Sequence, residues 1–147
     1  MKSSARVVVI GGGVVGASVL YHLTKAGWTD VVLVERKELT AGSTWHAAGG
    51  MHTLNGDPNV ARLQQYTVNL YKEIEKESGQ NCGIHLPGGI QLADTPERLD
   101  WLKMAHARGR YLGMKMEIIS VKEAKVLNPL LEEKYFVGAL YDEDEGS

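Results

Sequence analysis

The sequence predicts an α/β fold that begins with a strand–helix–strand unit in which the two strands are parallel. Three observations support this prediction. Residues 7–10 (VVVI) form a continuous β-branched run, which is typical of a strand covered on both faces. The glycine-rich turn GGGVVG follows at residues 11–16, and apolar residues then recur at helical spacing as far as Gly27. Residues 31–34 (VVLV) form a second β-branched run, which completes a βαβ unit of the usual length.

The composition excludes several other classes of protein. The chain has 147 residues, of which 44% are hydrophobic and 23% are charged, and its formal net charge is -2. These proportions are typical of a globular protein and not of a disordered, collagenous or membrane-spanning chain. The near-neutral charge gives no reason to expect nucleic acid as a partner. The single cysteine, Cys82, cannot form an internal disulfide and disfavours a structural zinc site.

No targeting segment or membrane span is recognisable in the sequence. The first six residues are mostly polar, and the apolar run at residues 7–10 is too short for a secretory signal or a bilayer-spanning helix. We therefore expect a cytoplasmic protein, or a protein of the mitochondrial matrix if its source is eukaryotic.

The remaining sequence predicts a long loop followed by helices and short strands in alternation. Residues 36–55 have no regular period, and loops of this length are usually functional or disordered. Asp57 and Pro58 suit the start of a helix that Gly79 ends. In chain order we expect a helix over 57–79, a strand over 90–93, a helix over 95–113, a strand over 116–119, a helix from the capping box of Ser120 and Glu123 to before Pro129, and a strand over 135–141.

The predicted elements divide into two parts. We expect residues 1–56 to form a nucleotide-binding βαβ unit with its loop, and residues 57–147 to form a helical segment and the first strands of a mixed-sheet substrate region. One βαβ unit with a few further strands leaves sheet edges uncovered, and a nucleotide crevice needs more strands. The acidic run at residues 142–145 is typical of a solvated loop that leads onward. We therefore expect the front part of a larger protein, inactive by itself.

The glycine turn has the spacing of a dinucleotide-binding fingerprint. Gly11, Gly13 and Gly16 follow a predicted strand and open a predicted helix, and Glu35 lies nineteen residues after Gly16. In this motif the first glycine permits the tight turn, the second lets a pyrophosphate approach the backbone, and the third lets helix and strand pack closely. The combination of strand, helix and acid predicts a bound dinucleotide.

Residues near the glycines also suit this ligand. The amides of Val14 and Val15 lie at the helix N-terminus, where the helix dipole favours an anion. Glu35 can accept hydrogen bonds from a ribose diol, and its charge would repel a 2′-phosphate. The motif does not distinguish FAD from NAD, because both contain an adenosine ribose.

The loop TAGSTWHAAGG at residues 40–50 is the second candidate site. In a doubly wound fold, the segment after the second strand lies near the cofactor crevice. Its small residues allow the backbone to approach a ligand, and the hydroxyls of Ser43 and Thr44 can bond phosphate or ribose. The chemistry of His46 leaves four roles open: a base, a hydrogen-bond donor, a covalent attachment point or a structural histidine.

These motifs together resemble the dimethylglycine dehydrogenase and sarcosine dehydrogenase family, which belongs to the D-amino-acid-oxidase-like flavoproteins. The resemblance rests on GGGVVG, VER and AGSTWHAAGG, and the segments LYKEIEKESGQ, HLPGGIQLA and GALYDEDEG also match. It extends from about Arg6 to Gly146, and STWHAAG is its most specific part. One departure lies at Gly50 and Met51, where the family pattern has Leu-Thr.

The resemblance implies FAD as the cofactor, held covalently by His46 through the flavin 8α-methyl carbon. It implies no catalytic residue within these 147 residues, since the acid and base groups of the family lie further along the chain. We expect no metal site, and His52, which follows the loop, is a candidate for lining the active site. The expected cofactor-binding residues are Gly11, Gly13, Val14, Val15, Gly16, Glu35, Arg36, Gly42, Ser43, Thr44, Trp45, His46, Ala47, Ala48, Gly49 and Gly50.

The implied activity is FAD-dependent oxidation of an N-methylated glycine, dimethylglycine or sarcosine, at the N-methyl carbon. The resulting iminium can hydrolyse to formaldehyde or pass its carbon to tetrahydrofolate, if a C-terminal folate module is present. The partners would be a small N-methyl amine and an unidentified electron acceptor. Three alternatives remain: an FAD-dependent oxidase of another amine or amino acid, a non-catalytic flavin-binding subunit, and an NAD-binding domain. The last is disfavoured by His46, because NAD has no 8α-methyl group.

Overall fold

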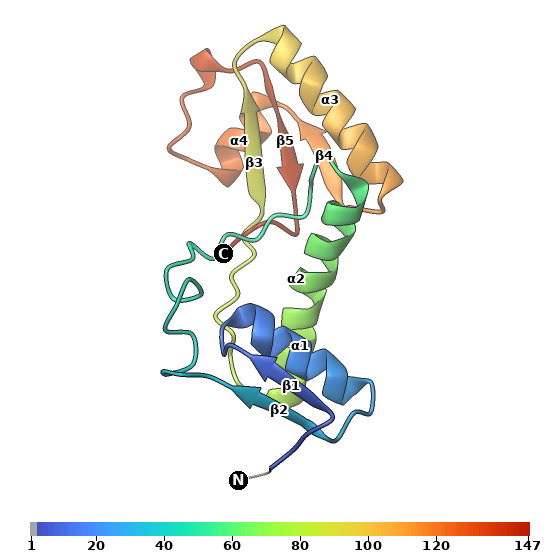
Figure 1. Cartoon of the computed structure of the whole chain (residues 1–147). Coiled ribbons are helices and arrows are strands. Elements are labelled where there is room, and N and C mark those ends of the chain that lie inside the picture. The colour runs from blue at the N-terminus through green and yellow to red at the C-terminus, as the bar shows by residue number, and fades with distance from the viewer. Residues whose placement is uncertain (1–2) are drawn as a thin grey trace. The chain divides into compact units, whose positions relative to one another are not determined.

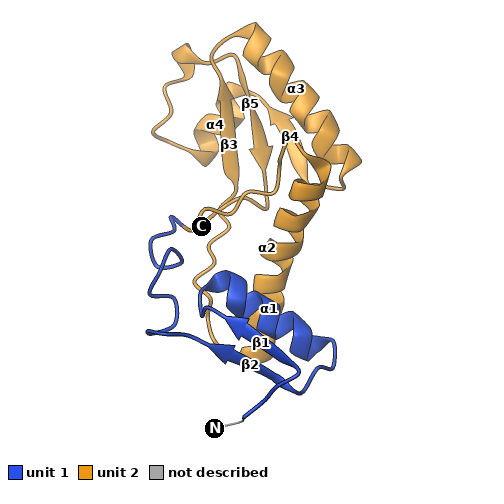
Figure 2. Ribbon diagram, in the orientation of Figure 1, with its two compact units in different colours: residues 1–48 blue, residues 49–147 orange. Residues whose placement is uncertain are grey.

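The computed structural model describes residues 3–147, which form two compact units, the first ending at residue 48 and the second covering residues 49–147 (Figure 2). Strands and helices alternate along the chain (Figure 1), which confirms the predicted α/β class. The boundary between the compact units lies after residue 48, earlier than the domain boundary predicted after residue 56. Residues 51–53 belong to the second unit, in which Met51 pairs with Gly146 and Thr53 with Asp142. The division into domains after residue 56 stays a prediction.

The first unit is the predicted βαβ unit. Strand β1 (Val7–Ile10) pairs in parallel with β2 (Val31–Val34), with Val7 opposite Val31. Helix α1 (Val14–Lys25) connects them and packs against both. After the C-cap residue Ala26, Gly27 adopts a φ of +86°, the left-handed conformation that commonly ends a helix.

The two strands of this unit are more exposed than the sequence predicts. The side of the sheet away from the helix is uncovered, since Ile10 is 85% exposed and Val8 is 51% exposed. The expectation of burial on both faces is therefore wrong for this chain. The reason is that the described part of the unit supplies two strands and one helix, and one helix can cover one face of a sheet.

The second unit contains an antiparallel sheet of three strands. Its strands are β3 (Gly89–Ala93), β4 (Met116–Ile119) and β5 (Gly138–Asp142), in the order β3-β5-β4. Asp142 at the end of β5 is opposite Gly89 of β3 and Met116 of β4. The expected strand over 135–141 begins later than predicted, because residues 133–135 form a 3₁₀ turn in which Glu133 accepts from the Phe136 N–H at 3.1 Å.

The predicted helices of this unit are confirmed, and their caps explain where they begin. Helix α2 (Pro58–Ser78) begins after Asp57, whose carboxylate accepts from two first-turn amides at 2.7 and 3.1 Å. Helix α3 (Pro96–Tyr111) begins after Thr95. The short helix α4 (Val121–Leu127) begins with the complete capping box that the sequence predicts.

The sheet of the second unit is packed on both faces. Leu140 of β5 is 1% exposed and packs with Leu102 of α3 on one face. The neighbouring Ala139 points to the other face and packs with Ala124 of α4. Figure 1 shows α3 and α4 on opposite sides of the three strands. In the part of the chain that the structure describes, no helix combines the length and the apolar character needed to cross a membrane.

Candidate dinucleotide-binding site

The three glycines of the fingerprint have separate structural reasons in the first unit. Gly11 has a φ of +106°, which only glycine adopts easily, and its N–H donates to the Val34 carbonyl at 2.9 Å. A Cβ at Gly13 would lie 3.0 Å from Thr44 Oγ1. A Cβ at Gly16 would collide with the Gly11 carbonyl oxygen. The turn therefore closes tightly on itself, as a dinucleotide-binding turn must.

Glu35 is attached to this turn at the end of β2. One carboxylate oxygen accepts from the Gly12 N–H at 2.7 Å, and the other accepts from the Lys37 N–H at 2.9 Å. The hydrogen bond from Gly12, followed by that from Lys37, lowers the pKa of the Glu35 carboxyl below its ordinary value. A carboxylate has about four acceptor positions, so Glu35 keeps capacity to accept from a ligand hydroxyl.

The loop after β2 folds back onto the glycine turn. The Thr40 N–H donates to the Gly12 carbonyl at 3.0 Å, and Thr44 Oγ1 accepts from the Val14 N–H at 2.9 Å. Thr40 holds a φ of +65°, which is costly for a β-branched residue and is the type of backbone strain that gathers at functional sites. The structure thus brings the glycine turn, Glu35 and the start of the loop into one cluster.

His46 lies in the same unit, and its ring is oriented by the loop itself. The His46 backbone N–H donates to the Ser43 carbonyl at 3.1 Å, and ring Nδ1 lies 2.9 Å from the Gly42 carbonyl oxygen. A carbonyl oxygen can only accept, so Nδ1 carries the hydrogen. In the neutral ring the lone pair is then on Nε2, and the side chain is exposed. Nε2 is therefore the ring nitrogen of His46 that the Gly42 carbonyl does not hold.

An open hollow of about 510 Å³ lies at the carboxyl ends of the two parallel strands, which is where open α/β sheets bind ligands. Its lining includes the predicted residues Glu35 and Arg36. The Val14 N–H, one of the predicted phosphate donors, is taken by Thr44, whereas the amides of Val15 and Gly16 have no acceptor one turn earlier in the helix. The lining residues are Ile10, Gly11, Val34, Glu35 and Arg36.

The predicted loop residues do not all belong to one compact unit. Those from Gly42 to Ala48 lie in the first unit, together with the glycine turn. Gly49 and Gly50 belong to the second unit, where Gly49 has a φ of +77°. The Gly50 backbone lies against the ring of His52, since a Cβ there would be 3.2 Å from Nε2.

Two features of the structure go beyond the sequence predictions. Gly12 was absent from the predicted site, although its N–H binds Glu35 and its carbonyl binds Thr40. The sequence contains a signal for Gly12, because three glycines stand in a row at residues 11–13 and the fingerprint requires only Gly11 and Gly13 among them. A Cβ at Gly12 would press on Leu39, at 2.5 Å, and on the Glu35 side chain.

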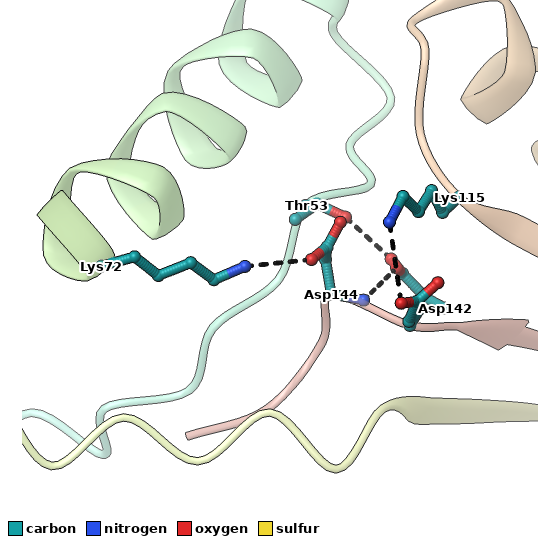
Figure 3. A network of polar contacts seen from close by, with 6 residues as sticks. Thr53, Lys72, Lys115, Asp142 and Asp144 are labelled. Atoms are coloured by element: carbon teal, nitrogen blue, oxygen red, sulfur yellow. Dashed lines mark hydrogen bonds and ion pairs between the residues drawn. The ribbon is translucent and has the colours of Figure 1, made fainter.

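The acidic run at residues 142–145 is the second such feature, and the expectation of a solvated loop is wrong for Asp142, which ends β5, whereas Glu143 is exposed. Asp142 is 3% exposed and accepts from the Thr53 hydroxyl at 2.7 Å, and its other oxygen accepts from the Asp144 N–H (Figure 3). Asp144 pairs with Lys72 of α2 at 3.2 Å. The buried carboxylate of Asp142 is retained because these hydrogen bonds compensate its lost hydration. Among the described residues, no three His, Cys, Asp or Glu side chains gather as metal ligands.

These features define a dinucleotide-binding α/β protein: the glycines join a strand to a helix, Glu35 is hydrogen-bonded to their turn, and a hollow lies at the strand ends. The sequence profile described as "FAD dependent oxidoreductase" matches residues 6–147, so the chain belongs to the family of D-amino-acid-oxidase-like FAD-dependent oxidoreductases. The cofactor of this family is FAD, which removes the NAD alternative. The resemblance drawn from the motifs is thereby confirmed.

The similar proteins are much longer than this chain. Dimethylglycine dehydrogenase of Rattus norvegicus, a mitochondrial protein, is 43% identical over 145 residues, which are 99% of this chain and 17% of that protein. The mitochondrial pyruvate dehydrogenase phosphatase regulatory subunit of Mus musculus is 41% identical over 96% of this chain and 16% of its own length. L-Proline dehydrogenase from P. horikoshii has a solved structure that matches with a TM-score of 0.88 at 26% identity, over 99% of this chain and 38% of that one.

Proposed function

We propose that this chain is the FAD-binding part of an enzyme that oxidises a small N-methylated glycine, dimethylglycine or sarcosine, at its N-methyl carbon. The observation that carries the proposal is the loop with His46, which is hydrogen-bonded onto the glycine turn in a chain 43% identical to a dimethylglycine dehydrogenase. Bound FAD would accept the hydride equivalent from the substrate, and the protein would supply position and electrostatics.

The residues of the first unit have distinct proposed roles toward FAD. The glycine turn gives the pyrophosphate close access to the backbone, where the amides of Val15 and Gly16 can donate to it. Glu35 accepts from the ribose hydroxyls while it holds the Gly12 N–H. Arg36 and the residues from Gly42 to Gly50 complete the set of proposed contacts. The fit rests on the open hollow and on the glycine positions that a side chain would fill.

His46 is the proposed point of covalent attachment. Covalent bonding to the flavin 8α carbon needs a neutral imidazole nitrogen with a free lone pair. Because Nδ1 donates a hydrogen bond to the Gly42 carbonyl, the geometry favours Nε2 as the atom that forms the covalent bond. The glycine turn and Glu35 do not depend on this bond, so FAD should still bind when the bond cannot form.

The test is His46→Ala in the full-length protein, compared with His85→Ala, which removes another exposed histidine. After acid precipitation, the wild type and His85→Ala should keep the flavin with the protein, and His46→Ala should release it. Peptide mass spectrometry of the wild type should find the flavin on the peptide that contains Trp45 and His46. Covalent flavin on the His46→Ala protein would refute the assignment.

A second candidate is a non-catalytic flavin-binding subunit. It is favoured by the 41% identity to a protein whose name describes it as a regulatory subunit. The two candidates differ in one measurement on the full-length protein, the anaerobic loss of flavin absorbance after addition of dimethylglycine or sarcosine. An enzyme should be reduced by one of these amines, whereas a regulatory subunit should keep an oxidised flavin. Reduction by another amine or amino acid alone would identify a different oxidase.

Two further parts of the proposal concern the larger protein. A tetrahydrofolate-binding module, if there is one, must lie outside these 147 residues. The location proposed for a eukaryotic protein is the mitochondrial matrix, supported by the mitochondrial rat relative. Fractionation of cells that express the full-length protein tests the location, and release of formaldehyde with and without added tetrahydrofolate tests the module.

A further inference from the structure

The second unit contains a hollow of about 330 Å³ that the proposed FAD contacts do not explain. One wall is the segment that follows the His46 loop, and the other is one face of helix α2. Three of its side chains are apolar, and the others are hydrogen-bonding groups without formal charge in their neutral forms. The lining residues are Gly49, Gly50, Met51, His52, Leu63, Gln64, Thr67, Val68 and Tyr71.

The polar groups of this hollow include hydrogen-bond acceptors beside the donors of the Gln64 amide and the Tyr71 hydroxyl. Gln64 Oε1 is buried and has no hydrogen-bond partner among the described residues. An unsatisfied buried carbonyl of this kind is costly and is expected to have a donor in the functional state. The Thr67 hydroxyl uses its hydrogen on the Leu63 carbonyl at 2.8 Å, so its lone pairs alone face other groups.

His52 adds another acceptor, because Glu145 holds its opposite nitrogen. The Glu145 carboxylate contacts His52 Nδ1, and an ionised carboxylate only accepts, so Nδ1 carries the hydrogen. The neutral ring then presents the lone pair of Nε2, which lies beside Gly50. The side chain of Glu145 is 16% exposed and crosses the backbone of Gly89, where a Cβ would collide with it.

The charges around the hollow favour a cation. No Lys, Arg, Asp or Glu is among the lining residues of the described chain. Lys72 follows Tyr71 in the sequence and is paired with Asp144 at 3.2 Å, which neutralises both. The carboxylate of Glu145, which contacts the lining residue His52, adds a negative charge beside the hollow. The apolar side chains of Met51, Leu63 and Val68 supply contact surface for methyl groups.

We propose that this hollow binds the protonated nitrogen of a small N-methylated amine. Gln64 Oε1 and His52 Nε2 accept its N–H groups, and Glu145 is a positioning residue that fixes the His52 ring and adds charge. A secondary ammonium has two N–H donors and can use both acceptors, whereas a tertiary ammonium can use one. The inference deepens the proposed function, on which it rests for the identity of the natural ligand.

The experiment uses the full-length, FAD-loaded protein and three cations of equal charge: dimethylammonium, trimethylammonium and tetramethylammonium. These have two, one and no N–H groups, and their binding is measured by calorimetry at one fixed pH. Affinity should fall in that order, by roughly tenfold or more between the first and the last, the size expected for charged hydrogen bonds. Equal affinities for the three cations would overturn the inference.

Variants identify the acceptors. Gln64→Met keeps the size of the side chain without its acceptor, and should reduce the preference for dimethylammonium over tetramethylammonium. Gln65→Met, on the same helix and outside the hollow, should leave the preference unchanged. Glu145→Ala should weaken the binding of all three cations and remove the order of their affinities, because it releases the His52 ring and removes a charge. Glu145→Gln should restore that order but not the full affinity. A preference unchanged in Gln64→Met would refute the role of Gln64.

Two further readouts distinguish amine binding in this hollow from flavin binding and from the proposed oxidation. If the hollow instead holds part of the flavin, Gln64→Met should lower the ratio of flavin to protein absorbance and leave cation binding unchanged, which would overturn the inference. If the N-methylated glycines are not oxidised but the graded cation binding and its loss in Gln64→Met are found, the proposed function fails and the binding site stands. If the N-methylated glycines are oxidised but the three cations bind with equal affinity, the proposed function stands and the inference about the hollow fails.

Discussion

At the scale of single residues, the candidate site depends on glycines that are required for different reasons. Gly11 is needed for its positive φ, whereas Gly16 is needed because any side chain would meet the Gly11 carbonyl oxygen. The second requirement is a backbone collision, which no side-chain movement can relieve. Gly56 is a useful contrast, since a Cβ there would lie 3.7 Å from the end of the flexible Arg108 side chain.

Gly16→Ala in the full-length protein should therefore abolish FAD binding or prevent folding, and Gly56→Ala should do neither. The collision forces α1 away from the turn, and the amides that would bind the pyrophosphate move with the helix. The ratio of flavin to protein absorbance after purification, together with the yield of folded protein, measures both effects. Normal flavin content in Gly16→Ala would contradict the close packing described for the turn.

Glu35 should make the stability of the turn depend on pH. Its pKa is lowered in the folded state, chiefly by the Gly12 N–H, so its contribution is present above the unfolded pKa of about 4.3 and is lost as pH falls through the folded value. The difference in melting temperature between the wild type and Glu35→Gln should be largest at neutral pH and should shrink below about pH 4.3. A difference that stays constant down to acid pH would exclude this role for the carboxylate.

At the scale of elements, the segment after the His46 loop is attached to the end of β5. Met51 and Gly146 exchange backbone hydrogen bonds at 2.7 and 3.0 Å, and the buried Asp142 carboxylate accepts from the Thr53 hydroxyl. These contacts place residues 51–53 in the second unit and fix one wall of the hollow that Gly49 to His52 form with α2. Thr53 is 2% exposed, so water cannot replace its hydroxyl if the side chain is changed.

Thr53→Val should destabilise the protein by about 1.5–3 kcal/mol, because it removes a hydrogen bond to a buried carboxylate and keeps the shape of the side chain. Thr24→Val is the matched control, since the Thr24 hydroxyl donates to the Tyr21 carbonyl on an exposed part of α1. Urea denaturation of the full-length protein measures both variants. Equal denaturation midpoints for Thr53→Val and the wild type would show that the hydrogen bond between Thr53 and Asp142 contributes nothing to stability.

At the scale of the whole molecule, the apolar surface of the first unit remains to be covered. Ile10 is 85% exposed, Val8 is 51% exposed and Val34 is 44% exposed, although all three belong to strands of a parallel sheet. Parallel sheets are normally covered on both faces. The chain spans 17% of the length of its rat relative, and we propose that other segments of the full-length protein cover this face.

The 147-residue chain expressed alone should bind the dye ANS, self-associate and lack amine turnover. Ile10→Thr should reduce dye binding by the isolated chain, because it replaces the most exposed apolar side chain of the sheet. The same change in the full-length protein should lower its melting temperature, since the position would then be buried. Dye fluorescence and light scattering check the first part, and unchanged melting of the full-length variant would refute the second.

The sequence by itself determined the features that depend on neighbours along the chain. Periodicity and end signals predicted the βαβ unit and the helices that begin at Asp57, Thr95 and Ser120, because a cap is formed within one turn of its own helix. The spacing of the glycines predicted the turn, and its motifs predicted the family. The last strand was predicted over residues 135–141, although β5 begins at Gly138. The reason is that β-branched and aromatic residues are common in strands and also occur in the segment just before this one.

Only the tertiary structure decided the contacts between distant residues. Thr44 reaches Val14 across 30 residues, Thr53 reaches Asp142 across 89, and His52 reaches Glu145 across 93. Local periodicity contains no information about such pairs, because they depend on how the loop and the last strand return to the same place. For the same reason the acidic run was expected to be solvated. Asp142 is buried instead, beside the Thr53 hydroxyl that folding brings to it, and the composition of the run alone could not reveal that partner.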